Sequence, residues 1–382
     1  MKEGKPFNFY EFFAGGGMAR AGLGERWQCL FANDSDPKKA ESYLDNWGED
    51  HFVCADVQRL TTADLPGVPA LSWASFPCQD LSLAGAGAGL YGQRSGTFWP
   101  FWNLMGKLRQ EGRAPHLIVL ENVYGALRSH GGADFVAIAE ALGAAGYRSG
   151  AMVMDAVHFV PQSRPRLFIV CVRADIDVPE SVMQPAPDPV WHPNALIEAA
   201  AKLSPAEAAQ WVWWNPGPPP HRTIQFADLI EEEPEGIEWH TQETTRRLLK
   251  MMTDTNRAKV RQAQMAAHRM VGGVYKRTRQ GVQRAEVRFD VSGCLRTPIG
   301  GSSRQTILLV EGQTVRSRLL SPREAARLMG LPDTYKLPNN YNAAYYLAGD
   351  GLAVPVVRFL AQQVLEPILK CVKNHRTEKE AA

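Results

Sequence analysis

The chain has 382 residues, of which 45% are hydrophobic and 21% are charged, and its formal net charge is +2. This composition predicts a soluble intracellular globular protein with enough chain for a large domain and a smaller one. No stretch approaches the ~18 uncharged apolar residues of a membrane helix, and no apolar signal core follows the N-terminus. We therefore expect a cytoplasmic protein that is not bound to a membrane.

The six cysteines are scattered along the chain, without a Cys-x-x-Cys pair or a cluster of histidines. This pattern argues against a disulfide framework and against a zinc site, so we predict no metal. Basic residues, by contrast, crowd one segment, Arg246–Arg288, which contains few acids. Such a local excess of positive charge makes a polyanion a plausible partner.

Short apolar segments alternate with helical patterns through the first half of the chain. A strand over Phe7–Phe13 runs into the glycines 15–17 and a helix through Leu23, and a second strand, Trp27–Ala32, precedes a helix that starts near Pro37. Later strands are expected at 52–54, 70–75, 117–120 and 166–172, with a helix over 133–145. This alternation predicts an α/β fold with a doubly wound, mostly parallel sheet covered on both faces.

Composition changes near Asp175, where frequent prolines begin to break up regular structure. Order is expected again at Ser321-Pro322-Arg323-Glu324, a helix N-cap signature, with Gly330 as the helix stop. A final amphipathic helix should return to pack near the first helix. We therefore predict a large domain formed by residues 1–175 and 316–382, with a smaller, irregular domain, 176–315, inserted into it.

A glycine run follows the first strand, and an acidic residue, Asp34, follows the second. Glycines let a ligand approach the backbone, and a carboxylate at an offset of ~20 residues binds ribose hydroxyls in many nucleotide sites. The same pattern also fits a tight turn in which Asp34 caps the next helix. By itself this signal is weak.

Three further motifs follow in order along the chain: Pro77-Cys78-Gln79, Glu121-Asn122-Val123 and Gln162-Ser163-Arg164-Pro165-Arg166. A lone cysteine after a strand is more often a small buried hydrophobic residue. Together with the preceding Phe12-Phe13-Ala14-Gly15-Gly16-Gly17, however, these motifs resemble those of the cytosine-C5 DNA methyltransferases of the bacterial restriction-modification type. The resemblance covers Phe9 to about Asp177 and about Arg316 to Leu369.

This resemblance implies the Rossmann-like fold of S-adenosylmethionine-dependent methyltransferases, with S-adenosylmethionine as the methyl donor. Asp34 would bind the ribose, and Asp56 and Val57 the adenine. Asp350 stands where related enzymes usually have asparagine, so its charge would alter a contact with the methionine end. The cofactor-binding set implied is Phe13, Ala14, Gly15, Gly17, Asp34, Ser35, Asp56, Val57, Pro77 and Asp350.

Four residues are implied to carry the chemistry. C5 of cytosine is a poor nucleophile, so the ring must first add a thiolate at C6, and Cys78 is the implied nucleophile. Glu121, at the end of an apolar strand, would hydrogen-bond N3 and the amino group, and burial would favour its protonated form. Arg166 would contact O2, and Arg164, on the same strand face, a carboxylate or phosphate. The alternative roles are structural: Glu121 would cap a helix, and Arg164 would be a solvated surface residue.

Residues 176–315 occupy the place of the family's target recognition domain, and the basic stretch in it would neutralise phosphates of double-stranded DNA. The alternative is that the basic stretch is a solvated face of a helix.

A cytosine inside a duplex hides C6 from Cys78, so base flipping is required. The glycine-rich segment after Gln79 fits a lid over the flipped base. Cys294 departs from the threonine that many members have. The DNA-binding residues predicted are Gln79, Ser82, Arg94, Arg296, Gly300, Gly301 and Arg304.

Two other functions stay open at this point. One branch of the family methylates cytosine in transfer RNA, but the Cys-Phe-Thr of that branch is absent from the middle domain. A non-catalytic DNA-binding protein of the same fold is the second, and the intact Cys78, Glu121 and Arg166 argue against it. We expect a monomer that associates with the nucleoid through DNA, with a cognate restriction endonuclease as a candidate partner.

Overall fold

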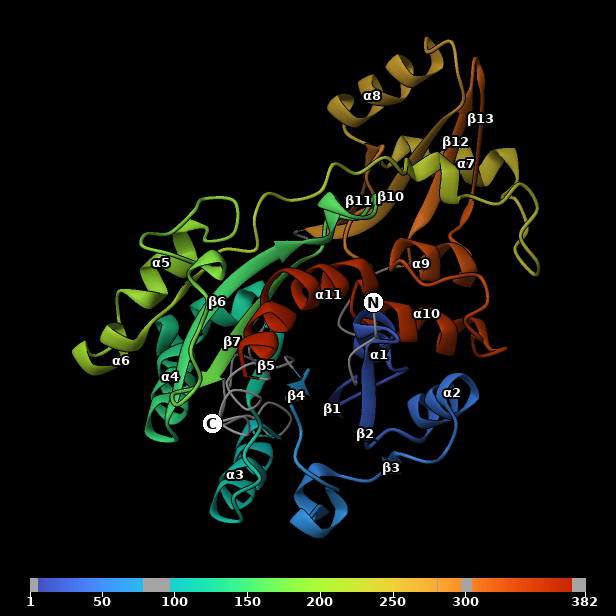
Figure 1. Cartoon of the computed structure of the whole chain (residues 1–382). Helices are drawn as coiled ribbons and strands as arrows, with labels where there is room; N and C mark the ends of the chain where they lie inside the picture. The colour runs from blue at the N-terminus through green and yellow to red at the C-terminus, as the bar shows by residue number, and fades with distance from the viewer. Residues whose placement is uncertain (1–5, 78–96, 280, 297–303, 373–382) are drawn as a thin grey trace, which may run out of the picture. The chain divides into compact units, whose positions relative to one another are not determined.

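The computed structural model describes residues 6–77, 97–279, 281–296 and 304–372 (Figure 1). The chain forms two compact units: the first contains the described residues of 1–154, 165–218 and 356–382, and the second those of 155–164 and 219–355. This division by compactness differs from the boundaries at 175 and 316 that we inferred from the sequence. The functional division into a catalytic domain and a recognition domain stays a prediction.

The first unit is built on a seven-stranded sheet in the order β3-β2-β1-β4-β5-β7-β6 (Figure 1). Five strands, β3, β2, β1, β4 and β5, run parallel to one another, and β7 runs antiparallel to β5. The predicted mostly parallel sheet is thereby confirmed. The strands are β1 (Phe7–Phe12), β2 (Trp27–Asp34), β3 (Phe52–Cys54), β4 (Leu71–Ala74), β5 (Leu117–Val123), β6 (Tyr147–Asp155) and β7 (Pro165–Arg173).

Helices and short turns of the first unit complete its core. Helix α3 places Phe98, Phe101, Leu104, Met105 and Leu108 on one buried stripe, as the helical period requires. The helical elements are α1 (Met18–Leu23), α2 (Pro37–Trp47), η1 (Val57–Arg59), η2 (Thr62–Asp64), α3 (Phe98–Gln110), η5 (Tyr124–Gly132), α4 (Ala133–Ala144), η7 (Glu180–Val182), α5 (Asn194–Ala200) and α6 (Pro205–Gln210), and a small sheet pairs β8 (Met183–Gln184) with β9 (Trp213–Trp214).

Two strands differ from the sequence-based expectation. Strand β5 continues beyond Leu120, because Glu121, Asn122 and Val123 pair with residues of β7. Strand β6 was not predicted, since Arg148-Ser149-Gly150 interrupts its apolar pattern. Both differences arise from pairing between strands, which the local sequence does not record.

The C-terminal helix packs against the start of the first unit, as predicted. It consists of α11 (Val354–Leu360) and a π-helical turn, η9 (Ala361–Leu365). Arg358 donates to the Ala21 carbonyl at 2.9 Å, and the Trp27 indole donates to Glu366 at 3.3 Å. The helical run Tyr341–Val372 is, by length and mean hydropathy (1.4), apolar enough to cross a membrane, contrary to our expectation. Because 67% of its apolar window is buried inside the protein, it has the character of a core helix.

The second unit is more regular than the irregular insert that we predicted. Its antiparallel sheet has the order β11-β10-β12-β13, and α7 and α8 cover one face of it with apolar side chains. Ser321 and Glu324 form the expected capping box at the start of α9. The elements are η6 (Ala156–His158), η8 (Phe226–Leu229), α7 (Gln242–Lys250), α8 (Asp254–Gln264), β10 (Met270–Arg279), β11 (Val282–Phe289), β12 (Thr306–Glu311), β13 (Thr314–Leu319), α9 (Pro322–Leu328) and α10 (Tyr341–Asp350).

The packing of the segment 176–218 onto β6 can be tested at Gly150. A Cβ atom there would lie 1.9 Å from the Val212 carbonyl oxygen, so Gly150→Ala must displace backbone. We expect it to lower the free energy of unfolding by about 2 kcal/mol or more. Gly143→Ala is the matched control, because its Cβ would meet only Glu207 at 3.9 Å. Equal urea midpoints for the two variants would contradict this packing.

Candidate active site

The described site residues of the first unit lie near the carboxyl ends of the parallel strands, on both sides of the point where the order of the strands reverses. In a doubly wound sheet the ligand lies outside the carboxyl ends of the strands at this switch point, which here falls between β1 and β4. The cofactor candidates Phe13, Asp56 and Pro77 follow β1, β3 and β4, whereas Asp34 is the last residue of β2. Six predicted site residues lie outside the described part of the chain: Cys78, Gln79, Ser82, Arg94, Gly300 and Gly301.

The glycine turn after β1 is bound directly to Asp34. Gly15 and Gly17 have φ of 55° and 76°, and the non-glycine Phe13 shares this left-handed region with φ 57°. Asp34, 8% exposed, accepts the Gly15 N–H at 2.9 Å and the Asp36 N–H at 2.9 Å. Helix α2 is capped by Asp36 and not by Asp34, which rules out the capping alternative.

A nucleoside ligand fits this turn. A Cβ atom built on Gly15 would meet nothing within 4 Å, so the turn is open on that side. The Asp34 carboxylate retains acceptor capacity for hydroxyl groups, since a carboxylate offers about four lone-pair sites. Ser35 and Asp56 are exposed. Val57 is only 3% exposed within the hydrophobic core, which leaves little of its side chain for the predicted adenine contact.

Glu121 and Arg166 face each other across β5 and β7. The Arg166 Nε lies 3.4 Å from the Glu121 Oε1, and the two side chains are 16% and 11% exposed. Glu121 lies within β5 and pairs with Phe168, so it is not a helix cap. The two side chains therefore form an ion pair with little contact with solvent.

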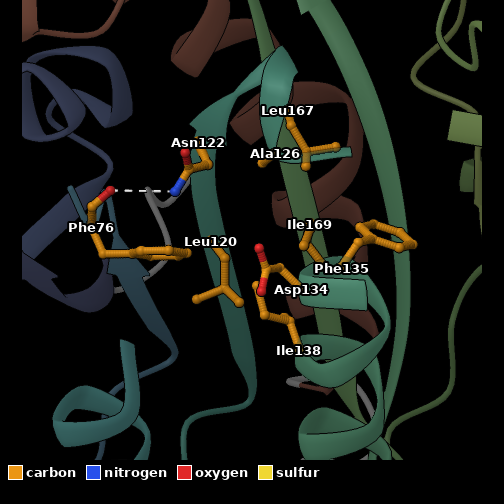
Figure 2. Close-up of a pocket in the computed structure, with 9 residues that line it drawn as sticks. All are labelled: Phe76, Leu120, Asn122, Ala126, Asp134, Phe135, Ile138, Leu167 and Ile169. Atoms are coloured by element: carbon orange, nitrogen blue, oxygen red, sulfur yellow. Dashed lines mark hydrogen bonds between the residues drawn. The ribbon is translucent and has the colours of Figure 1, made fainter. Parts of the chain in front are cut away.

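Asn122 joins the ends of β4 and β5. Its amide nitrogen donates to the Phe76 carbonyl at 3.4 Å, and its amide oxygen accepts the Val123 N–H at 2.9 Å (Figure 2). Because Phe76 directly precedes Pro77-Cys78, this bond holds the segment that leads to the predicted nucleophile.

The pocket below Asn122 in Figure 2 is mostly apolar, with side chains of Leu120, Ile138 and Leu167. It has room for about one water molecule, too little for a base.

Arg164 lies in the second unit and is not a solvated arginine. It is 1% exposed, and its terminal nitrogens donate to the carbonyls of Gly349 (2.8 Å), Gly351 (2.7 Å) and Leu295 (3.0 Å). It precedes β7, which starts at Pro165, so the argument that it alternates with Arg166 along a strand does not hold. Its contacts hold the backbone on both sides of Asp350, whose side chain is exposed. Catalytic and cofactor roles for these two residues stay predictions.

Two other basic candidates of the second unit, Arg296 and Arg304, have different surroundings. Arg296 is exposed, whereas Arg304 binds the Asn342 side chain and lies over the Tyr341 ring at 5.1 Å. The described part of the basic stretch is helical in α7 and α8, whereas Met270–Arg279 and Val282–Phe289 are the paired strands β10 and β11. The reading as a solvated helical face therefore does not apply to the hairpin.

Sequence reasoning missed Glu11, a buried residue of β1, the strand that leads into the glycine turn. It is 1% exposed, and its Oε1 accepts the Arg20 backbone N–H at 3.4 Å. Burial raises its pKa to about 8, and the nearby Asp34 charge adds to the rise, while Arg20 opposes it. The sequence feature that could have revealed Glu11 is a carboxyl group inside the apolar strand Phe7–Phe12.

The described residues contain no group of three or more histidine, cysteine, aspartate or glutamate side chains that could hold a metal ion.

Comparisons with known proteins agree on one family. A family model described as C-5 cytosine-specific DNA methylase matches residues 7–366. The chain is 27% identical to the Type II methyltransferase M.NlaX of Neisseria lactamica, over 94% of this chain and 96% of that protein. It is 25% identical to the Type II methyltransferase M.HhaI of Haemophilus parahaemolyticus, over 93% of each. The solved structure of the S. pombe Dnmt2 methyltransferase covers 95% of this chain and 99% of its own, with a TM-score of 0.59 and 18% identity, and supports the fold.

The pKa of Glu11 predicts a pH dependence of stability. The folded protein keeps this proton up to about pH 8, whereas the ordinary value is 4.5, so the contribution of Glu11 to stability falls as pH rises through that window. Glu11→Gln cannot ionise and should gain stability relative to the wild type, by a few kcal/mol, between pH 5 and about 8. Urea unfolding at several pH values measures this difference. The control Glu41→Gln, at an exposed position, should show a flat difference, and a flat result for Glu11→Gln would refute the prediction.

Proposed function

The chain belongs to the C-5 cytosine-specific DNA methylase family, and from this premise we propose that it methylates C5 of a flipped cytosine in a short duplex DNA sequence. One observation carries the proposal. Asn122 bonds the end of β5, with the paired Glu121 and Arg166, to the segment leading into Pro77-Cys78. The described parts of these motifs in the first unit, Pro77, Glu121-Asn122-Val123 and Pro165-Arg166, thus lie at neighbouring strand ends, which supports the proposal.

The nature of the relatives favours DNA over transfer RNA as the substrate. Relatives that match more than 90% of this chain are named Type II methyltransferases. We propose the same modification role for this chain, in the cytoplasm and as a monomer, with a restriction endonuclease as a possible companion enzyme. Double-stranded DNA is the partner that this role requires.

The target cytosine would be held by the Glu121–Arg166 pair. O2 and N3 are neighbouring atoms on one edge of the ring, so the groups that bind them must also be neighbours. The 3.4 Å separation of the two side chains meets this requirement. Arg166 would donate to O2, and Glu121 would bind N3 and the amino group, which withdraws electrons from the ring.

The proposed reaction begins when the Cys78 thiolate adds to C6, which forms the S–C6 bond and moves an electron pair toward C5. S-adenosylmethionine would supply the methyl group as an electrophile: the electron pair at C5 would form the new C–C bond while the methyl–sulfonium bond breaks, which leaves S-adenosylhomocysteine. A base, which we propose to be a bound water, then removes the C5 proton. The electron pair of that C–H bond restores the ring double bond, and the S–C6 bond breaks to release the thiolate.

The glycine turn and Asp34 would hold the donor. The turn is open at Gly15, where backbone can approach a ligand, and the Asp34 carboxylate lies beside it. Phe13, Ala14, Gly17, Ser35, Asp56 and Pro77 are the further proposed contacts in the first unit, and Asp350 is proposed in the second. The chemistry of this set suits a nucleoside with free hydroxyl groups.

An arginine face on the second unit is a candidate DNA surface. We define it as Tyr275, Arg277, Arg284 and Arg288, which share the face of β10-β11 opposite α7 and α8. The three arginines are exposed, and two of them lie over the Tyr275 ring at 5.7 and 5.9 Å. Exposed guanidinium groups spaced along a hairpin suit successive phosphates of a duplex.

The arginine face predicts a salt-dependent loss of affinity. Arg277→Gln and Arg288→Gln should each weaken duplex binding and reduce the slope of log affinity against log salt by about 1. Fluorescence anisotropy with a labelled duplex measures both quantities. The control Arg246→Gln removes an equally exposed charge from α7, behind the sheet, and should leave the slope unchanged. Slopes that respond equally in all three variants would contradict the assignment.

Covalent trapping tests the proposed reaction. With S-adenosylmethionine and duplex DNA containing 5-fluorocytosine, the wild type should form a complex that survives denaturing electrophoresis, because fluorine at C5 cannot leave as a proton. Cys78→Ser should form none, and RNA of the same sequence should not compete. Trapping on RNA in preference to DNA would support the transfer RNA alternative, and no trapping on either would revive the non-catalytic one.

A further inference from the structure

The glycine turn is held from behind by an aromatic pair on α2. The Trp47 indole N–H donates to the Gly16 carbonyl at 3.0 Å. A Cβ atom on Gly17 would lie 2.3 Å from the Trp47 Nε1 and 2.9 Å from the Tyr43 ring, so these rings fill the space behind the turn. Neither aromatic residue belongs to the motifs that define the site.

Arg20, from α1, fixes the orientation of both rings. Its guanidinium lies 4.9 Å from the centre of the Trp47 ring and 5.8 Å from that of Tyr43. It also donates to the Tyr43 hydroxyl at 2.9 Å, and its backbone N–H is bound by Glu11. The indole is thus held in place by its own bond and by a cation on its face.

The turn needs such support because it contains three consecutive glycines. Glycine loses more conformational freedom on ordering than any other residue. Asp34 holds the Gly15 N–H on one side, and Trp47 holds the Gly16 carbonyl on the other. These two bonds bracket the Gly15–Gly16 peptide and fix it before a ligand arrives, which reduces the entropy lost on binding.

We propose that Trp47 is a positioning residue for the methyl donor. It touches neither cofactor nor substrate in this scheme, and it acts through the Gly16 carbonyl on the shape of the turn. This inference rests on the proposed function, since it assumes that the turn binds S-adenosylmethionine. The inference adds to the proposed function a statement about Trp47: donor binding depends on this residue, and methyl transfer does not.

The test is calorimetric titration of the full-length protein with S-adenosylhomocysteine, without DNA, for the wild type and Trp47→Phe. The variant keeps an aromatic ring and loses one neutral hydrogen bond, so its affinity should fall about three- to tenfold. In steady-state assays the KM for S-adenosylmethionine should rise by the same factor, with kcat at saturation and the KM for DNA unchanged. A merely structural residue would not produce this split.

Trp191→Phe is the matched control, because the Trp191 indole donates to another glycine carbonyl, that of Gly217, at 2.8 Å. Its affinity for S-adenosylhomocysteine should equal that of the wild type. If Trp47→Phe does not fold, Arg20→Met, which removes the guanidinium from both rings, should weaken affinity in the same direction. Unchanged affinity in the folded variant would overturn the inference, whereas a wild type that does not bind S-adenosylhomocysteine would overturn the proposed function itself.

Discussion

The parallel pairing of β1 with β2 on one side and β4 on the other is the constraint on which the candidate site depends. Because β1 pairs with both, the chain must reverse direction across the sheet at this strand. The carboxyl ends of the parallel strands then open onto one crevice. The turn that we propose to bind the donor lies on one side of that reversal, and Glu121 and Arg166, proposed to bind the base, lie on the other.

Buried polar groups near the crevice are used to fix backbone. Asp34 binds two backbone N–H groups, Trp47 binds a glycine carbonyl, and Asn122 binds the carbonyl before Pro77. Each of these bonds gives a backbone group a side-chain partner. In the second unit, Arg164 does the same for the glycines on both sides of Asp350. These bonds hold the loops that we propose to bind ligands in one conformation before binding.

Much of this arrangement could be predicted from the sequence, where the deciding interactions are local. The strands β1 and β3, the capping box at Ser321 and the order of the motifs follow from apolar patterns and from neighbouring residues. Strand β6, the extension of β5 and the inclusion of 176–218 in the first unit depend on pairing with distant residues. The role of Trp47 was hidden for the same reason, since Gly16 lies 31 positions away from it. The contacts of Arg164 were hidden too, because the carbonyls of Gly349 and Gly351 that it binds lie 185 and 187 positions away.

The most direct test of the central claim is base-resolution bisulfite sequencing of DNA from a methylation-free bacterial host that expresses this protein or its Cys78→Ala form. The account predicts conversion-resistant cytosines in one short sequence context with the wild type, and none with the alanine form. Full conversion despite soluble, folded wild-type protein would contradict the claim that this chain methylates DNA at C5 of cytosine.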